Sequence, residues 1–251
     1  MNSLFTGLLV FAGIFCAALL AMRLRAFLPE RHQSPETKDT VKVAMALVGT
    51  MTALLLGLMV ASAKSTYDAQ KASVITTAAN LVMLDRMLAH YGPEADPSRE
   101  SLRGAVGRMV TQIWPESPGH AAQLDPNASR ADVVFDAIEA LVPQNDPQKA
   151  VKALSLNSAI ALGQTRWLLF EQSGHSIAVP LLGIVIAWLA LLFFSFGLFA
   201  PANGTAVAAL MVSALSVAGA IFLILELDQP FDGLIHIPSA PMHSALNNLG
   251  K

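Results

Sequence analysis

Six charged residues stand at the ends of long apolar stretches, where a charge can act on an ion or anchor a helix. They are Lys64, Asp68, Arg166, Glu171, Glu226 and Asp228. Charges at the edge of a membrane can form a ring at the mouth of a pore, and they can equally well hold helices at the interface. Because their expected depths match, the sequence predicts that Arg166 could pair with Asp68, or Lys64 with Glu171.

The acidic residues Glu226 and Asp228 follow directly on an apolar run that ends at Leu225. Acidic groups at membrane depth are costly and often functional. Their place at the end of the run also allows them simply to reach the interface, without a special role. The sequence leaves both interpretations open.

Small residues recur at every fourth position of the second apolar stretch: Gly49, Ala53, Gly57, Ala61 and Ser65. Such a stripe lies along one side of a helix and lets another helix approach closely. The partner could be another helix of the same chain or a second copy, and the stripe could also line a pore. The spacing alone does not choose among these three roles.

No arrangement typical of catalysis or of metal binding accompanies these residues. None of the six histidines lies three or four residues from another, and the single cysteine, Cys16, lies in an apolar stretch. Phosphate-binding and dinucleotide-binding glycine motifs and a nucleophile elbow are missing from the sequence. We therefore expect no enzyme activity, no metal site and no cofactor, and the net charge of −2 predicts no nucleic-acid partner.

The elements that must position these residues are long membrane helices. The chain of 251 residues is 54% hydrophobic and only 14% charged, against about 25% charged in a typical soluble domain. A helix needs roughly 20 apolar residues to cross a bilayer. Four stretches without any charge meet this length: 4–22, 43–63, 177–200 and 202–225. These predict a multi-pass protein of the inner cell membrane, and they exclude a soluble enzyme, a secreted disulfide-bonded domain and a disordered chain.

A helical domain outside the bilayer is predicted for the region 64–176. The second span is expected to continue as one helix to Gly92, because no proline or glycine lies between Lys64 and Tyr91. Further helices are expected from three start signals. These are Ser98 as an N-cap, a capping box that begins at Ser129, and Asp146 as an N-cap before a proline.

Three segments are expected to be non-helical. The polar segment 23–42 is expected to be a loop, and the residues 201–204 to be a tight turn between spans three and four. The proline-containing tail is expected to be irregular apart from an ordered turn at 227–233. The predicted fold is all-α, a four-span helical membrane protein with a helical extramembrane domain between spans two and three. The predicted divisions are 1–63, 64–176, 177–227 and 228–251.

The charges that flank the spans indicate sidedness. Five basic residues lie in the segment between spans one and two, and three lie within about 20 residues of a span on the opposite side. The first group is Arg23, Arg25, Arg31, Lys38 and Lys42, and the second is Lys64, Lys71 and Arg166. The positive-inside rule then favours a cytoplasmic loop and an external helical domain.

Several stretches of the sequence, spread over nearly the whole chain, resemble a bacterial membrane family of unknown function that is called bestrophin-like. The stretches are 28–32, 36–39, the second span through 63–65, 143–146, 164–171, 196–203, 225–235 and 239–241. The matches at 196–203 and 225–235 are the most specific. One departure is Gln229, where the family pattern usually has arginine.

The resemblance implies kinship with the bestrophins, which are pentameric anion channels with four membrane helices. Their helical domain lies in the cytoplasm between the second and third spans, so the resemblance and the charge count disagree on sidedness. The bestrophins' own pore motifs do not appear in this sequence, so no pore residue is carried over.

Two functions therefore compete. The first is an oligomeric anion channel, embedded in the lipid bilayer, in which span two lines the pore and Lys64 and Arg166 supply positive potential at one mouth. The second is a non-transporting membrane scaffold or sensor whose helical domain binds a partner protein. A homo-oligomer is expected for the channel, and a monomer or dimer for the scaffold.

Overall fold

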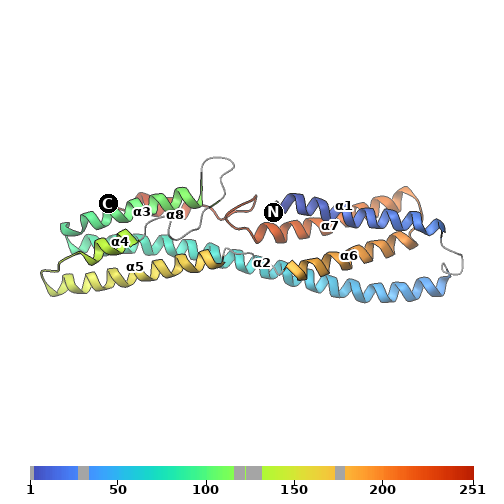
Figure 1. Ribbon diagram of the computed structural model, residues 1–251, viewed down its shortest axis with the longest axis horizontal. Coiled ribbons are helices and arrows are strands. Elements are labelled where there is room, and N and C mark those ends of the chain that lie inside the picture. Colours follow the sequence, from blue (N-terminus) through green and yellow to red (C-terminus); the bar gives the residue numbers. More distant parts are fainter. Residues whose placement is uncertain (1–2, 28–33, 116–121, 123–131, 173–178) are drawn as a thin grey trace. The chain divides into compact units, whose positions relative to one another are not determined.

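The computed structural model of the chain describes residues 3–27, 34–115, 122, 132–172 and 179–251, and in these residues every regular element is a helix (Figure 1). Two compact units result. Unit 1 comprises Met1–Thr66 and Ser176–Asp228, and unit 2 comprises Tyr67–His175 and Gln229–Lys251. The α-helices are α1 (Ser3–Leu24), α2 (Pro35–Tyr91), α3 (Asp96–Ile113), α4 (Asp132–Glu139), α5 (Asp146–Gln172), α6 (Val179–Phe199), α7 (Gly204–Leu227) and α8 (Ala240–Asn248). Short 3-10 turns, η1 (Arg25–Phe27) and η3 (Pro93–Ala95), follow α1 and α2.

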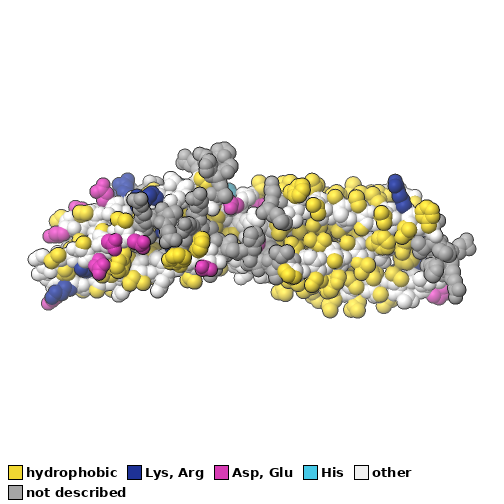
Figure 2. Space-filling view, viewed as in Figure 1, with side chains coloured by type: hydrophobic (Ala, Val, Ile, Leu, Met, Phe, Trp, Pro, Cys, Tyr) yellow, Lys and Arg dark blue, Asp and Glu magenta, His cyan; other side chains and the backbone are white. Residues whose placement is uncertain are grey.

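Four helices of the described residues are long and apolar enough to cross a membrane, as the sequence predicts. They are α1, α2, α6 from Pro180, and α7. The surface of unit 1 is covered by hydrophobic side chains in the face that Figure 2 shows, whereas acidic and basic side chains are spread over unit 2. A surface of apolar side chains that is too large for a soluble protein is stable only in lipid, so the protein is a membrane protein.

Close helix packing in unit 1 depends on two glycines. Helix α1 packs along both α6 and α7. At Gly197 of α6, an added Cβ atom would overlap the carbonyl oxygen of Ala18, and at Gly7 of α1 it would lie 3.2 Å from the Cβ atom of Phe222. Small residues of this kind let helix backbones approach each other in membranes. The close packing of α1 against α6 and α7 therefore depends on glycine at these two positions.

The loop between α6 and α7 is the tight turn that the sequence predicts. Asn203 caps α7, because its side chain accepts a hydrogen bond of 2.8 Å from the backbone N–H of Ala206. The backbone N–H of Asn203 in turn donates to the carbonyl oxygen of Pro201 at 2.8 Å. An Asn cap after a proline ends one helix and begins the next within a few residues.

Two predicted helix starts are wrong. The segment 23–42, expected to be a loop up to the start of span two, is helical from Pro35, where α2 begins. The hydroxyl of Ser34 accepts a hydrogen bond from the backbone N–H of Thr37 at 3.3 Å and so starts this helix. Helix α3 begins at Asp96, and Ser98 does not cap it. The Ser98 hydroxyl is buried and instead donates a hydrogen bond to the carbonyl oxygen of Ala137 in α4.

A third start signal is displaced by one residue. Helix α5 begins at Asp146, but the capping side chain is that of Asn145, which accepts a hydrogen bond of 2.8 Å from the backbone N–H of Gln148. The capping box expected at Ser129 and the end of the predicted domain near residue 176 lie outside the described residues. Helix α2 itself continues to Tyr91 without interruption, as predicted.

The core of unit 2 is built from two segments that are far apart in the sequence. The second half of α2 packs with α3, α4 and α5, and the chain returns after α7 to add α8 and the residues before it. The expectation of an irregular tail is therefore wrong. Met242, Ala245 and Leu249 recur at helical spacing and are 3% exposed or less, so burial of this stripe stabilises α8.

Candidate functional site

The small-residue stripe of α2 is exposed along most of its length in a single chain. Ala53, Gly57, Ala61 and Ser65 are exposed, and a Cβ atom at Gly57 would meet nothing within 4 Å. Gly49, at the start of the stripe, lies closer to α6, because its Cβ atom would be 3.9 Å from Leu192. Most of the stripe is thus not used for packing inside one chain.

A different face of α2 packs within unit 1. Thr52, Met59 and Ala63 are 5% exposed or less, and these residues lie on another side of the helix from Gly57 and Ala61. Only 11% of the most apolar window of α2 is buried, against 28% for α1 and α7 and 33% for α6. Among the described membrane helices, α2 therefore has the largest apolar surface left for lipid or for another chain.

Three of the predicted boundary charges are exposed. Lys64 and Asp68 lie on α2, one helical turn apart, and Glu171 lies on the last turn of α5. The pairings predicted from their depth stay predictions. Arg166 has a different environment, because it is partly buried and lines a cavity in unit 2.

Glu226 and Asp228 are buried at the C-terminal end of α7. Glu226 is 3% exposed and Asp228 is 7% exposed, so neither projects into solvent from the chain. The hydroxyl of Ser3, in the first turn of α1, donates a hydrogen bond to Oε1 of Glu226. A buried carboxylate requires such donors to offset its lost hydration. Ser3 was not singled out from the sequence, and only the antiparallel packing of α1 on α7 reveals it.

A second buried carboxylate, Asp85 of α2, was also missed by the sequence reasoning. Its side chain is completely buried, and Arg99 of α3 donates two hydrogen bonds to it, of 3.0 Å and 3.1 Å. The backbone N–H of Gly250 donates a third at 3.2 Å. The hydrogen bonds to Asp85 raise the pKa of the Arg99 guanidinium above its usual value. This cluster joins α2, α3 and the segment after α8, so its role is structural.

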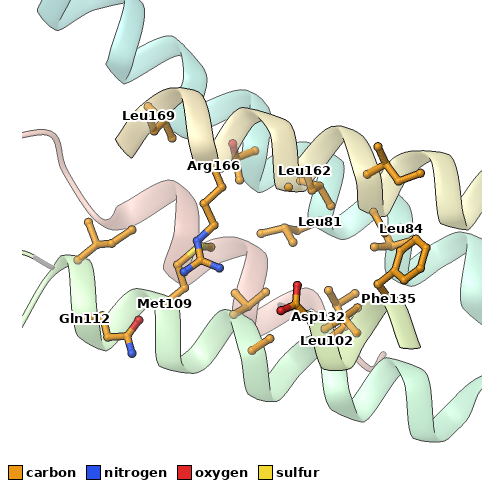
Figure 3. A pocket seen from close by; sticks show the side chains of 18 residues that line it. Leu81, Leu84, Leu102, Met109, Gln112, Asp132, Phe135, Leu162, Arg166 and Leu169 are labelled. Atoms are coloured by element: carbon orange, nitrogen blue, oxygen red, sulfur yellow. The ribbon is translucent and has the colours of Figure 1, made fainter. Parts of the chain in front are cut away.

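The cavity that Arg166 lines lies among α2, α3, α4 and α5 and has a volume of about 250 Å³. Figure 3 shows Arg166 extending from α5 toward Met109 of α3, with Asp132 nearer to Leu102. The remaining walls are mainly apolar. No group of three or more His, Cys, Asp or Glu side chains suited to a metal ion occurs within the described part of the chain.

Comparison with known proteins supports the resemblance seen in the sequence. A search of curated proteins finds no match. Solved structures that match include two crystal structures of a bacterial bestrophin homologue from Klebsiella pneumoniae, each with one substitution. One is 13% identical with a TM-score of 0.69 and 97% of each chain covered. The other is 12% identical with a TM-score of 0.70, and covers 99% of this chain and 97% of its own. At these identities the likeness shows the fold.

The family follows from a match to most of the sequence rather than from the fold. The family model described as a bestrophin-like domain matches residues 12–242, which include all four membrane helices in part or in full and both segments of unit 2. This protein therefore belongs to the bestrophin-like family.

Proposed function

We propose that copies of this chain assemble into a closed ring that conducts anions across the inner cell membrane, with the membrane part of α2 around the central pore. The observation that carries the proposal is the exposed small-residue face of α2. Its residues Ala53, Gly57, Ala61 and Ser65 are small and are exposed in the single chain. A ring of copies would place this face of each subunit toward the axis or against its neighbour.

The charges near the end of the membrane part of α2 support a role at the pore mouth. Lys64 is exposed at this position, and a ring of copies repeats its charge around the axis. Repeated charges of one sign at a mouth raise the local concentration of the opposite ion. Membership in the bestrophin-like family favours anions as that ion.

The alternative is a membrane scaffold or sensor whose helical unit binds a partner protein. One observation favours it. Large apolar side chains of unit 2 are exposed in the single chain, with Met83 60%, Val142 72% and Leu154 56% exposed. Where such side chains form one contiguous patch, they mark contact with another protein. A ring of copies would cover part of it as well, so the number of subunits separates the two functions.

The first experiment is the subunit number in mild detergent by native mass spectrometry, followed by chloride flux from liposomes. We expect a closed ring of four or more copies and a measurable flux. Lys64→Glu is expected to lower the preference for chloride over potassium, because it reverses the charge at the mouth. Lys149→Glu makes the same charge change at the exposed start of α5 and is expected to leave the preference unchanged.

Either of two results would contradict the channel. A monomer in every detergent would leave α2 with no symmetric partner around a pore. A ring without any flux would favour the scaffold, and crosslinking at the exposed apolar residues of unit 2 would then be the way to recover its partner.

A further inference from the structure

A groove with a volume of about 800 Å³ lies in unit 1 between α2 and α6, and two residues of α7 also line it. Its walls are mainly apolar. Leu189, Leu192 and Phe193 of α6 are buried, whereas Phe196 of α6 and Ala53 of α2 are exposed. The groove therefore has a buried floor and is open at the surface of the unit. Ligand pockets usually have volumes of about 300–1,000 Å³ and mostly apolar walls, so the groove is large enough for a ligand.

The sequence positions of the lining residues place the groove at membrane depth. On α2 they begin at Lys42, which directly precedes the uncharged stretch 43–63, and they end at Leu56. This part of the helix is about 21 Å long, which is more than half the thickness of a hydrocarbon core of about 30 Å. An acyl chain that reaches from one membrane surface to the middle of the bilayer can therefore lie along the groove.

Neither water nor empty space suits this groove in a bilayer. A bound water molecule needs several polar partners, and the hydroxyl of Thr52, which lines the groove, already donates to the carbonyl oxygen of Val48 at 2.7 Å. An empty groove would leave its walls without van der Waals contacts on one side. The acyl chain of a lipid supplies these contacts and needs no hydrogen bond.

Two basic side chains lie at one end of the groove. Lys42 lines it from α2. Arg25 of η1 donates a hydrogen bond to the carbonyl oxygen of Ala200, which lines the groove directly after the end of α6. The C-terminal ends of α1 and α6 and the start of α2 lie at this same end of unit 1 (Figure 1). The apolar groove thus ends beside positive charge at the edge of the membrane.

The ion pair of Lys42 does not exclude a further anion. Lys42 pairs with Asp39 at 3.0 Å, but the two side chains are 69% and 73% exposed. An exposed pair of this kind is weak, and a lysine ammonium group has three hydrogen-bond donors. A phosphate group can therefore contact Lys42 while Asp39 stays in place.

The charge of this boundary favours an anionic lipid over a second copy of the chain. The segment 23–42 has five basic and three acidic residues. In a ring, where all copies face the same side of the membrane, a second copy would bring the same excess of positive charge to this boundary. A lipid phosphate brings negative charge instead, and basic pockets between membrane helices bind anionic headgroups.

We propose that the groove binds an anionic phospholipid, with one acyl chain between α2 and α6 and the phosphate beside Lys42 and Arg25. The acyl chain supplies apolar contact along the groove, and the headgroup fixes the end at which the lipid enters. This site lies within unit 1 of a single chain, so it does not rest on the proposed channel.

The test is native mass spectrometry of the full-length protein in detergent, titrated with phosphatidylglycerol or with phosphatidylcholine that has identical acyl chains. Both headgroups contain a phosphate, but only phosphatidylglycerol has a net negative charge. We expect the first lipid per chain to bind at a concentration at least about fivefold lower for phosphatidylglycerol than for phosphatidylcholine. Equal binding of the two lipids, or no bound lipid with either, would overturn the proposal.

A filling variant connects the lipid to the groove. Ala46 and Ala44 are both exposed on α2, two residues apart, and only Ala46 lines the groove. Ala46→Trp is expected to weaken phosphatidylglycerol binding at least about fivefold, because the indole occupies the place of the acyl chain, and Ala44→Trp is expected to leave it unchanged. Unchanged lipid binding in Ala46→Trp would reject the site. If the same variant instead lowers the subunit number, the groove holds a second copy.

A charge variant tests the headgroup end. Lys42→Gln is expected to weaken phosphatidylglycerol binding about fivefold and to leave phosphatidylcholine binding unchanged. Arg23→Gln is the matched control, because Arg23 is exposed in the last turn of α1 and does not line the groove. Equal weakening in both variants would show a general attraction of the basic boundary for anionic lipid and would contradict a site at Lys42.

Discussion

At the scale of single residues, the tightest constraint in unit 1 is the contact of Gly197 with Ala18. A hydrogen atom at the Cα of Gly197 fits against the Ala18 carbonyl oxygen, whereas a methyl group would overlap it. Gly183 lies on the same helix and faces open space, because a Cβ atom there would meet nothing within 4 Å. These two glycines of α6 are indistinguishable by local sequence, and only the path of α1 separates them.

We predict that Gly197→Ala lowers the free energy of unfolding by about 1–3 kcal/mol, because the methyl group forces α1 and α6 apart. Gly183→Ala is expected to leave it unchanged or to raise it slightly. Thermal unfolding of both variants in one detergent measures the difference. Equal melting temperatures for the two variants would show that α1 does not approach α6 as closely as described.

Residues that act locally were predictable from the sequence, and residues that act over long distances were not. Asn203 after Pro201 has the chemistry of a turn and cap, and it forms both. Asp85 and Arg99 are separated by 14 residues, and their ion pair forms only because η3 turns α3 back along α2. Ser98 has the chemistry of a cap, but the approach of α4 gives it a different partner.

At the scale of elements, α8 is held by polar contacts as well as by its apolar stripe. Arg99 donates to Asp85 and to the carbonyl oxygen of Lys251, and Arg86 donates to the same carbonyl oxygen at 3.0 Å. The C-terminal segment is thus fixed at a buried ion pair. No local pattern predicted this, because the partner residues lie more than 150 positions earlier in the chain.

We predict that Arg99→Leu destabilises unit 2 by about 3–5 kcal/mol, because it leaves Asp85 buried without its counter-charge. Hydrogen exchange of α8 is expected to become faster in the same variant, since the segment loses an anchor. The side chain of Asp96 is 65% exposed, and its Oδ1 atom lies 3.6 Å from Nη1 of Arg99. Asp96→Asn removes only this exposed partner of Arg99 and is expected to lower the free energy of unfolding by less than about 1 kcal/mol. Unchanged exchange of α8 in Arg99→Leu would contradict the anchoring role.

At the scale of the whole molecule, the four spans were predictable because hydrophobicity and length are enough to define them. The resemblance to the bestrophin-like family was confirmed by the family match. The cavity of unit 2 was not predictable, because the residues that line it are brought together only by the packing of α2, α3, α4 and α5. The sidedness of the helical region, the pore residues and the subunit number stay predictions.

Assembly can be tested at Gly57, where an added Cβ atom would meet nothing within 4 Å in a single chain. We predict that Gly57→Leu leaves the helix content of the chain unchanged but weakens the ring or reduces its chloride flux, because the added side chain occupies the face between copies or toward the pore. Gly183→Leu is the matched control on α6, another membrane helix, with equally open space. If Gly57→Leu changes neither the subunit number nor the chloride flux, this face of α2 lies neither between copies nor toward the pore.

The two-segment construction of unit 2 also bears on how the protein is made. Domains generally fold in the order of synthesis, but the core of this unit includes Phe231, Ile237, Met242 and Leu249, which leave the ribosome last. The core of unit 2 therefore cannot be completed by α2 to α5 alone. Part of their apolar surface stays uncovered while α6 and α7 are inserted into the membrane. During this interval the nascent chain is a natural target for chaperones and for quality-control proteases, and a chain that stops before α8 would remain one.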